Sequence, residues 1–385
     1  MNRGESHIAL TNRALGWAST MDGIRGGAGR GVRLAHEGAA SLGPSAVLGR
    51  KEREELEDAF LAPGASRSKG AGTRSLAEEP DELRTCFERD RDRILHSTAF
   101  RRLAGKTQVF VFPADHQRTR LTHALEVAQV ATAIASALRL NVALCEAIAL
   151  GHDCGHGPGG HASEDALSPF VEGGFDHAVW GADVTALPLN LCAETLDGIR
   201  NHSWSRPAPS TPEGEVVALA DRIAYTAHDL EDAARCAVVD LADLPEAVVE
   251  RCGRARGSQL RAFIEDTVRV SSSTGRVALS DEMGGALSEL RLFNYERIYL
   301  RPASLDQSER VVKMLRSLVE HYAAHPAEMG SDGGSFIEHL EPGSPDALRH
   351  AVGYVAGMTD RFACTQAAAR LGWAADRLPR GSGSF

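Results

Sequence analysis

The feature of this 385-residue sequence that most constrains its fold is the repeat of apolar residues at the spacing of an α-helix. The clearest case is the segment 121–138, where Leu121, Ala128 and Leu138 belong to one stripe along a helix. Aromatic residues make up only 5% of the chain, whereas β-sandwiches are rich in them. The sequence shows neither an alternation of strands with helices nor an internal repeat. We therefore predict an all-α globular body over residues 85–375.

The same periodicity predicts where individual helices lie. The expected helices cover residues 51–61, 89–100, 121–138, 141–150, 162–170, 191–199, 216–234, 310–322 and 347–371. Residues 268–285 contain three consecutive serines and end in two glycines, a composition that predicts a loop or a short hairpin. Residues 1–80 are rich in Gly, Ala and Arg, with stretches such as 26–29, and predict a largely irregular extension apart from one short helix.

Composition disfavours several classes of protein. The formal net charge of −10 argues against a general nucleic-acid binder, because such proteins need a basic field. Seven cysteines, an odd number without a C-x-x-C pair, support neither a disulfide framework nor a zinc ribbon. We therefore expect reduced cysteines in a cytoplasmic protein. No apolar run reaches the roughly 18 to 20 residues of a membrane span, so we expect no membrane association.

The densest chemistry lies in a glycine-rich loop, residues 151–161, which holds three histidines and one aspartate. No Gly-Lys-Ser/Thr follows, so the loop is not a phosphate-binding P-loop. His152 and Asp153 are adjacent and can bind one ion, and His123 and Asp221 on apolar helices can complete its ligands. Singly, a helical His or Asp is ordinary, but the four in this order predict a metal site. Mixed nitrogen and oxygen ligands suit Mn²⁺, Fe²⁺ or Zn²⁺, and Mg²⁺ less well.

Several motifs in order resemble the HD superfamily and, within it, the deoxyguanosinetriphosphate triphosphohydrolase-like family. The similar stretches are residues 89–103, 106–110, 118–123, 151–161, 194–200, 220–225 and 357–361. The resemblance implies an HD-domain helical bundle. Its phosphohydrolase core would span residues 85–235 and the C-terminal helical part of the same body residues 236–375, with a flexible tail at 376–385.

The resemblance also implies a reaction, in which water attacks the α-phosphorus of a deoxynucleoside triphosphate (dNTP) and releases deoxynucleoside and triphosphate. It implies one divalent cation per subunit, Mn²⁺ before Mg²⁺, Fe²⁺, Co²⁺ or Zn²⁺. The implied metal ligands are His123, His152, Asp153 and Asp221. Two positions depart from the family pattern: Cys154 stands where a bulky residue is common, and Gly159 stands where Phe is common. Neither supplies a ligand, so we expect differences in pocket shape and loop stiffness only.

Residues beside this loop are expected to carry out the catalysis. His161 and Glu164 lie three positions apart at a helix start and so share a face. A carboxylate orients an imidazole and stabilises its protonated form, which suits a general acid for the leaving 5′-oxygen. The alternative is a surface pair. His177 matches a further family histidine near the phosphates, and could equally be a surface-loop residue.

Five further residues are expected to hold the substrate. Arg120 shares a helix face with the first metal ligand and suits phosphate clamping, and Arg222 is a weaker candidate. Tyr225 and Asp229 continue the stripe of the last ligand at four-residue intervals. The resemblance assigns them to the sugar, where Tyr225 would disfavour a 2′-hydroxyl, and it assigns Gln108 there too. A solvated charge or an ordinary core tyrosine is the alternative in each case.

Two other functions stay open. One is another HD nucleotide phosphohydrolase, of the 5′-nucleotidase type. The other is a dNTP-sensing or nucleic-acid-binding protein with little turnover. Related proteins form symmetric oligomers, so we expect a homo-oligomer, a hexamer or a tetramer. An allosteric dNTP or a single-stranded nucleic acid is a further partner that the resemblance allows. The sequence does not reveal which dNTP is preferred.

Overall fold

The computed structural model describes residues 11–20, 23–25, 32–36, 38–43, 45–113, 116–329 and 340–380. The chain divides into two units, residues 1–48 and 49–385. In the first unit, the described residues form α1 (Asn12–Thr20) and an antiparallel pair of short strands, β1 (Ile24–Arg25) and β2 (Arg33–Leu34). The predicted irregular extension therefore contains a helix and a ribbon that the sequence analysis missed. The stretch 26–29 lies outside the described residues.

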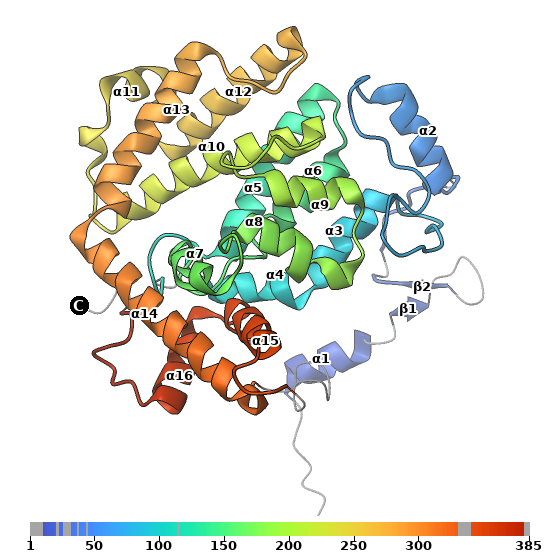
Figure 1. Cartoon of the computed structure of the whole chain (residues 1–385). Helices are drawn as coiled ribbons and strands as arrows, with labels where there is room; N and C mark the ends of the chain where they lie inside the picture. The colour runs from blue at the N-terminus through green and yellow to red at the C-terminus, as the bar shows by residue number, and fades with distance from the viewer. Residues whose placement is uncertain are drawn as a thin grey trace, which may run out of the picture. The chain divides into compact units, whose positions relative to one another are not determined.

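The second unit is built from helices, which confirms the predicted all-α class (Figure 1). Its α-helices are α2 (Arg50–Phe60), α3 (Cys86–His96), α4 (Thr98–Arg102), α5 (Arg120–Leu138), α6 (Val142–Gly151), α7 (Ala162–Leu167), α8 (His177–Trp180), α9 (Ala193–Asn201), α10 (Pro212–Arg235), α11 (Glu246–Cys252), α12 (Arg256–Thr274), α13 (Asp281–Asn294), α14 (Pro302–Ala324), α15 (Pro345–Ala356) and α16 (Asp360–Leu371). Short 3₁₀ turns lie at Leu103–Gly105, Ser168–Phe170, Leu187–Leu189, Leu241–Asp243 and Pro326–Glu328, and π-turns at Gly181–Thr185 and Tyr295–Tyr299.

Helices α5, α6 and α10 form the centre of the main hydrophobic core. Among the described residues, α5 alone is long and apolar enough, by length and composition, to cross a membrane. It instead packs against α6, α10 and α12, and its side chains Arg120 and His123 are buried inside the protein. Helix α5 is therefore a core helix that brings polar side chains into the interior.

A second hydrophobic core joins α14, α15 and α16 to α7. Tyr322 of α14 is fully buried there and donates from its hydroxyl to Gln366 Oε1 of α16, 2.7 Å away. Figure 1 shows α11–α13 at one end of this unit and α14–α16 at the other, with α5, α6, α9 and α10 between them. Because α7 follows the glycine-rich loop directly, this second core supports the loop from the C-terminal side.

The prediction of a loop at residues 268–285 is wrong, because α12 and α13 occupy most of this segment. Serine in a helix can donate its hydroxyl to a backbone carbonyl three or four residues back, and so does not have to end the helix. Ser272 and Ser273 do this, to Arg269 O and Val270 O, each at 2.9 Å. The turn between the helices begins only at Gly275, whose φ of +71° ends α12.

Two predicted helices are each broken into two. The expected helix 89–100 is divided at Ser97, which ends α3 and accepts from Phe100 N to begin α4. The expected helix 347–371 is divided at residues 357–359, where Thr359 accepts from Phe362 N to begin α16. N-capping by Ser or Thr restarts a helix in a new direction. The periodic pattern did not reveal either break.

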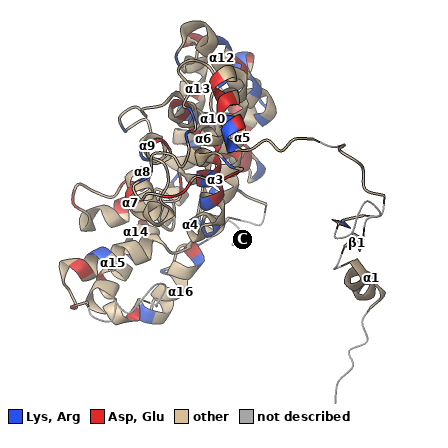
Figure 2. Ribbon diagram, turned by 90° about the vertical axis from the view of Figure 1, so that its right-hand side faces the viewer, with Lys and Arg blue, Asp and Glu red and all other residues tan. Residues whose placement is uncertain are grey.

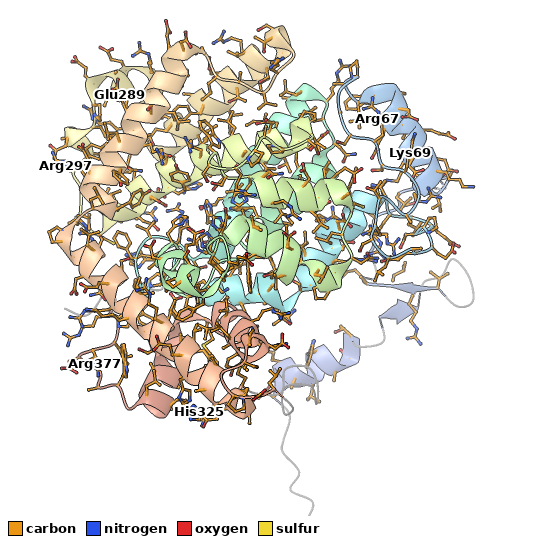
Figure 3. The ribbon with its side chains drawn as sticks, in the orientation of Figure 1. Arg67, Lys69, Glu289, Arg297, His325 and Arg377 are labelled. Carbon is orange, nitrogen blue, oxygen red and sulfur yellow. The ribbon has the colours of Figure 1, made fainter. Side chains whose placement is uncertain are left out.

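Positions of charged residues of both signs are interspersed along the helices of this unit in the ribbon of Figure 2. Exposed charges such as Glu289, Arg297 and Arg377 lie at its rim (Figure 3). Arg297 lies in the stretch 291–301, which contains three arginines. Its exposed position agrees with a solvated side chain.

Candidate metal centre and active site

Four side chains from three helical regions converge as the sequence predicted. His123 lies on α5, Asp221 on α10, and His152 and Asp153 directly follow α6. His123 Nε2 lies 3.0 Å from Asp221 Oδ1 and 3.9 Å from Asp153 Oδ2. His152 Nε2 lies 3.4 Å from Asp153 Oδ1 and 3.7 Å from Asp221 Oδ1. Two imidazoles and two carboxylates thus point at a common centre.

The orientation of His152 fits a metal ligand. Its Nδ1 lies 2.6 Å from Ala149 O, so this nitrogen carries the hydrogen and donates it to the carbonyl. That bond leaves a lone pair on Nε2, which is buried and has no hydrogen-bond partner. A buried polar atom without a partner calls for an explanation, and metal-bound histidines commonly donate their second nitrogen to a carbonyl. The donor set therefore fits one divalent cation.

Arg120 forms an ion pair with one of these carboxylates. Its Nη1 lies 2.7 Å from Asp153 Oδ2, and both side chains are buried. Burial opposes ionisation of Asp153, but Arg120 and the nearby histidines hold the pKa of this carboxyl well below its usual range. Asp153 is therefore ready to bind a cation, and Arg120 orients it. Nε of Arg120 has no hydrogen-bond partner and is available to a substrate.

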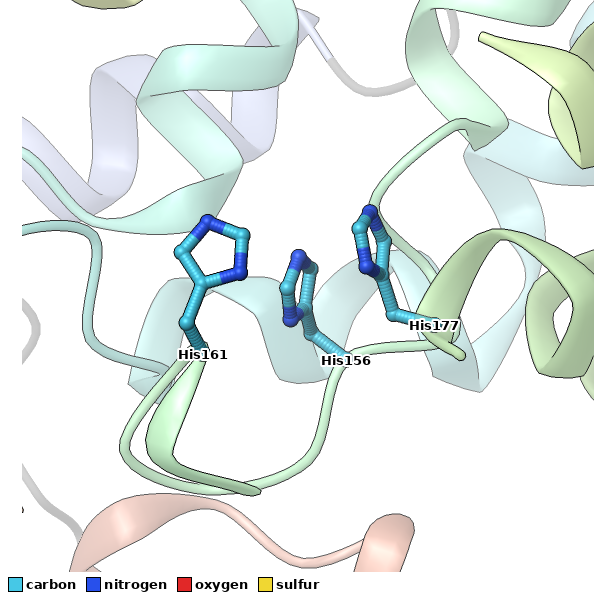
Figure 4. Close-up of side chains that lie close together, drawn as sticks. All are labelled: His156, His161 and His177. Atoms are coloured by element: carbon cyan, nitrogen blue, oxygen red, sulfur yellow. The ribbon is translucent and has the colours of Figure 1, made fainter. Parts of the chain in front are cut away.

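Three more histidines lie beside the metal ligands. Figure 4 shows His156 between His161 and His177. The rings of His156 and His177 stack with centroids 3.6 Å apart, and His156 Nε2 lies 3.2 Å from Asp153 Oδ1. His161 is exposed, whereas the other two are buried. This second group of imidazoles therefore lies between the metal ligands and solvent.

Glu164 on α7 connects two of these imidazoles. Its Oε2 lies 3.1 Å from His161 Nδ1, and its Oε1 lies 2.7 Å from His177 Nδ1. Oε1 also accepts from the backbone N of His177 at 3.0 Å. Burial opposes ionisation, but the hydrogen bonds from His161 and His177 keep the pKa of Glu164 well below its usual range. An ionised Glu164 thus turns the Nε2 atoms of both histidines away from itself.

A cavity of about 450 Å³ opens beside these groups. It is lined by all six residues expected to bind substrate: Gln108, Arg120, His177, Arg222, Tyr225 and Asp229. His161 and three of the four predicted metal ligands also line it. The guanidinium of Arg222 stacks on the ring of Trp204, 3.5 Å from its centroid. A ligand in this cavity could therefore contact the Arg222 guanidinium, His161 and His177 together.

Two buried acceptors in this cavity lack partners. Asp229 Oδ2 accepts from the Tyr299 hydroxyl at 2.5 Å, but Asp229 Oδ1 has no hydrogen bond. Gln108 Oε1 is likewise buried and without a partner. Burial raises the pKa of Asp229 to about 7. Tyr225, between Asp229 and the predicted metal ligand Asp221 on α10, accepts from Arg291 Nε at 2.8 Å. The two acceptors without partners suit a ligand that carries hydroxyl donors.

Comparison with known proteins agrees with this geometry. Residues 120–226 match the HD domain, and residues 277–369 match the phosphohydrolase-associated domain. A deoxyguanosinetriphosphate triphosphohydrolase-like protein of Caldanaerobacter subterraneus subsp. tengcongensis is 41% identical over 321 residues, which cover 82% of this chain and 93% of the relative. A protein with the same description from Clostridium perfringens (strain 13) is 42% identical over 332 residues, covering 82% and 95%. This chain belongs to the deoxyguanosinetriphosphate triphosphohydrolase-like family of HD-domain proteins.

All four predicted ligands lie within the residues 120–226 that match the HD domain. A hypothetical protein from Aquifex aeolicus, known from a crystal structure, is 19% identical. The similarity covers 74% of this chain and 69% of that chain with a TM-score of 0.46, which is too low to support a conclusion.

The sequence analysis missed one histidine of this HD-domain site. His202 directly follows α9, is 2% exposed, and places its Nε2 3.2 Å from His177 Nε2. Its Nδ1 lies 2.8 Å from Ile199 O, the same arrangement that orients His152. His202, His152 and Asp221 together form a further group that could hold a cation. The available signal was a histidine placed directly after a helix, which occurs at His152 as well.

The two departures from the family pattern are explained by their surroundings. Gly159 has a φ of +74°, and a Cβ added there would lie 2.5 Å from Val311 Cγ1, so a side chain does not fit this backbone. Cys154 is buried and its Sγ lies 3.8 Å from Leu150 O. Burial raises the pKa of its thiol to about 12, so Cys154 stays a neutral packing residue.

Proposed function

We propose that this protein hydrolyses dNTPs, dGTP among them, to deoxynucleoside and triphosphate by water attack at the α-phosphorus. The observation that carries this proposal is the meeting in one cavity of three predicted metal ligands, two oriented histidines, and buried acceptors without partners. Its relatives are described as deoxyguanosinetriphosphate triphosphohydrolase-like, which supports the same substrate class. Mn²⁺ is the cation we expect, before Mg²⁺, Fe²⁺, Co²⁺ or Zn²⁺.

His123, His152, Asp153 and Asp221 would hold the cation. A bound divalent cation lowers the pKa of a coordinated water and polarises a phosphoryl oxygen. Arg120 and Arg222 supply positive charge for the phosphates. His161, oriented through its Nδ1 by Glu164, presents Nε2 to the cavity and donates a proton to the leaving 5′-oxygen. His177, oriented by the same carboxylate, is placed beside the phosphates.

We place the sugar beside Asp229 and Gln108, both of which line the cavity. Asp229 Oδ1 and Gln108 Oε1 are buried acceptors without partners, and leaving such atoms unpaired costs roughly 1 to 3 kcal/mol each. A sugar hydroxyl can donate to them and remove that cost. The ring of Tyr225 would lie under the ribose and leave little room for a 2′-hydroxyl. This arrangement favours a deoxynucleotide over a ribonucleotide.

Separation of the products by phosphate chain length tests the proposal. Purified protein with Mn²⁺ is incubated with each dNTP and each ribonucleoside triphosphate, alone and in mixtures. We expect inorganic triphosphate and deoxynucleoside from dNTPs and little from ribonucleotides. Orthophosphate as the product would instead favour a 5′-nucleotidase type of hydrolase. Tight dNTP binding without turnover would favour a sensor, or a binder of single-stranded nucleic acid.

A matched pair of variants links the activity to the site. Asp221→Asn removes a carboxylate from the metal group and should abolish hydrolysis together with bound metal. Asp346→Asn removes an exposed carboxylate that pairs with Arg349 on the surface, and should leave both unchanged. Hydrolysis that survives in Asp221→Asn would contradict the proposed site.

The proposal extends to assembly and location. We propose a homo-oligomer, a hexamer or a tetramer, whose activity an allosteric dNTP or a single-stranded nucleic acid can modulate. Light scattering of the purified protein with and without dNTPs measures its mass directly. We place the protein in the cytoplasm, where its seven cysteines would remain the free thiols that the structure contains.

A further inference from the structure

The turn between α15 and α16 makes direct contact with two segments of the candidate active site. Asp360, the first residue of α16, is 5% exposed. Its Oδ2 accepts from Thr107 N at 2.9 Å and from the Thr107 hydroxyl, and its Oδ1 accepts from Gly159 N at 2.8 Å. One carboxylate therefore joins the segment of Gln108 to the glycine-rich loop.

A second tie runs through Lys106, which is 3% exposed. Its Nζ donates to His156 O and to Ala356 O, and Ala356 is the last residue of α15. Burial lowers the pKa of Lys106 to about 8, which still leaves the amine mostly protonated at neutral pH. Lys106 thus holds the glycine-rich loop at His156, and Asp360 holds the same loop at Gly159.

Asp360 does not serve as the N-cap of α16. The cap of this helix is Thr359, whose side chain accepts from Phe362 N at 3.3 Å. The hydrogen bonds found for Asp360 go to residues more than 200 positions earlier in the chain, none to the amides of α16. An acid in the first turn of a helix is common, but here its acceptors are turned toward the active-site segments.

The tied atoms are close neighbours of residues that we place at the substrate. Thr107 precedes Gln108, and Gly159 lies two residues before His161. The two segments also touch directly, since a Cβ on Gly160 would lie 3.2 Å from Thr107 O and 2.9 Å from Arg120 Nη2. A change in the spacing of Thr107 and Gly159 would therefore displace groups that must fit one substrate.

We infer that Asp360 is a positioning residue, which fixes the glycine-rich loop with His161 relative to Gln108 and thereby makes the C-terminal helices part of the active site. The inference rests on the proposed hydrolysis of dNTPs for its kinetic consequence. It gives the region matched as the phosphohydrolase-associated domain, residues 277–369, a physical task.

The test compares two buried carboxylates of similar setting. In Asp360→Asn, one of the two oxygens becomes an NH₂ group, which faces an N–H donor and cannot accept, so one tie is lost. In the control Asp266→Asn, the wild-type carboxylate is 7% exposed and accepts from Ser280 N at 2.8 Å and from the Ser280 hydroxyl at 3.1 Å, joining α12 to the start of α13. Both variants should be destabilised, but only the first should lose activity.

We expect Asp360→Asn to lower kcat by about 10-fold or more, because small misplacements of reacting groups cost up to about 100-fold. KM for dGTP should change less than kcat, and Mn²⁺ content should stay at the wild-type level. Asp266→Asn should keep wild-type kcat at a temperature below its own Tm. Thr107→Val removes only the hydrogen bond from the Thr107 hydroxyl to Asp360 and should also lower kcat. This variant replaces Asp360→Asn in the test if Asp360→Asn does not fold.

Hydrogen exchange provides a readout that does not depend on turnover. Amides of residues 157–161 should exchange about 10-fold faster in Asp360→Asn, and at the wild-type rate in Asp266→Asn. An inactive wild-type protein would count against the proposed function, and the exchange rates would still test the inference. Equal kcat in the two Asn variants, equal exchange of this loop, or loss of Mn²⁺ from Asp360→Asn would overturn it.

Discussion

At the residue scale, a single carboxylate determines how two imidazoles face the cavity. Glu164 binds the Nδ1 atoms of His161 and His177, so only the Nε2 of each ring is turned away from it, and that of His177 lies 3.2 Å from His202 Nε2. Spacing in the sequence predicted the pair His161 and Glu164, because residues three apart share a helix face. It did not predict that His177, thirteen residues later, would bind the same carboxylate.

Glu164→Gln should therefore lower kcat strongly. The amide keeps one acceptor and turns a donor toward the other imidazole, so one histidine loses its orientation. We expect kcat for dGTP to fall by about 100-fold, within the range that general acid–base catalysis contributes. Steady-state kinetics with saturating Mn²⁺ measures this effect.

Asp165→Asn is the matched control, since Asp165 is the next residue on α7 and its side chain is exposed. It should keep the wild-type kcat. Bound Mn²⁺ should be unchanged in both variants, because neither residue is among the four metal ligands. A Glu164→Gln protein with wild-type kcat would exclude the assigned role.

Asp229 should make stability depend on pH. Its pKa is about 7 in the folded protein and returns toward the ordinary value of 3.8 on unfolding. Between these values the folded state keeps a proton that the unfolded chain has released, so stability falls as pH rises from about 4 to 7, by at most about 1.4 kcal/mol per pH unit. The free energy of unfolding, measured with urea, should differ less between pH 5 and pH 8 for Asp229→Asn than for wild type. If the two proteins showed the same difference in unfolding free energy between these pH values, a raised pKa of the buried Asp229 carboxyl would be contradicted.

The predicted metal ligands could be picked out from the sequence because they occur together in a fixed order beside apolar helices: His123, the pair His152–Asp153, and Asp221. Two features beside these residues could not be predicted from the sequence. His202 carries no motif of its own, and its place beside His177 depends on how α9 packs. The ion pair between Arg120 and Asp153 joins residues 33 positions apart, and only the folded structure shows that this arginine is partly committed to a metal ligand.

At the element scale, most long helices follow from apolar periodicity, which succeeded for α5 and α10 and failed where helix ends depend on local hydrogen bonds. Ser97 and Thr359 break expected helices because their side chains cap the next ones. Residues 268–285 were misjudged because serine and glycine were taken as loop formers. Packing of α12 and α13 against the core outweighs these weak local preferences.

A pair of identical substitutions tests the helical assignment of this segment. Gly285 lies inside α13 and Gly275 ends α12, and an added Cβ meets nothing within 4 Å at either position. Gly285→Ala should stabilise the protein by about 0.5–1 kcal/mol, because Ala favours the helix. Gly275→Ala should destabilise it by about 1 kcal/mol or more, because φ there is +71°.

Chemical denaturation measures both free energies of unfolding. The two substitutions add the same methyl group in open space, so a difference in sign reports backbone conformation alone. Equal effects at the two positions would indicate that residues 275 and 285 have similar backbones, as in the loop that the composition predicted.

At the scale of the whole molecule, every residue of the candidate site lies in the second unit, residues 49–385. A chain that begins at Gly49 should therefore bind Mn²⁺ and hydrolyse dGTP within about two-fold of the full chain, as expected of a unit with its own core. Metal analysis and product chromatography of the two proteins test this. Loss of activity on truncation would show that residues 1–48 contribute to catalysis or assembly.

The stacking of Arg222 on Trp204 gives the protein an optical signal of its own. Of the four tryptophans in the chain, Trp204 is the one that lines the cavity, and it is 53% exposed. A triphosphate that draws the guanidinium away would change the surroundings of the indole ring. Ligand binding should therefore alter tryptophan emission without any label, and this change should vanish in Trp204→Phe, so that binding can be timed separately from bond cleavage.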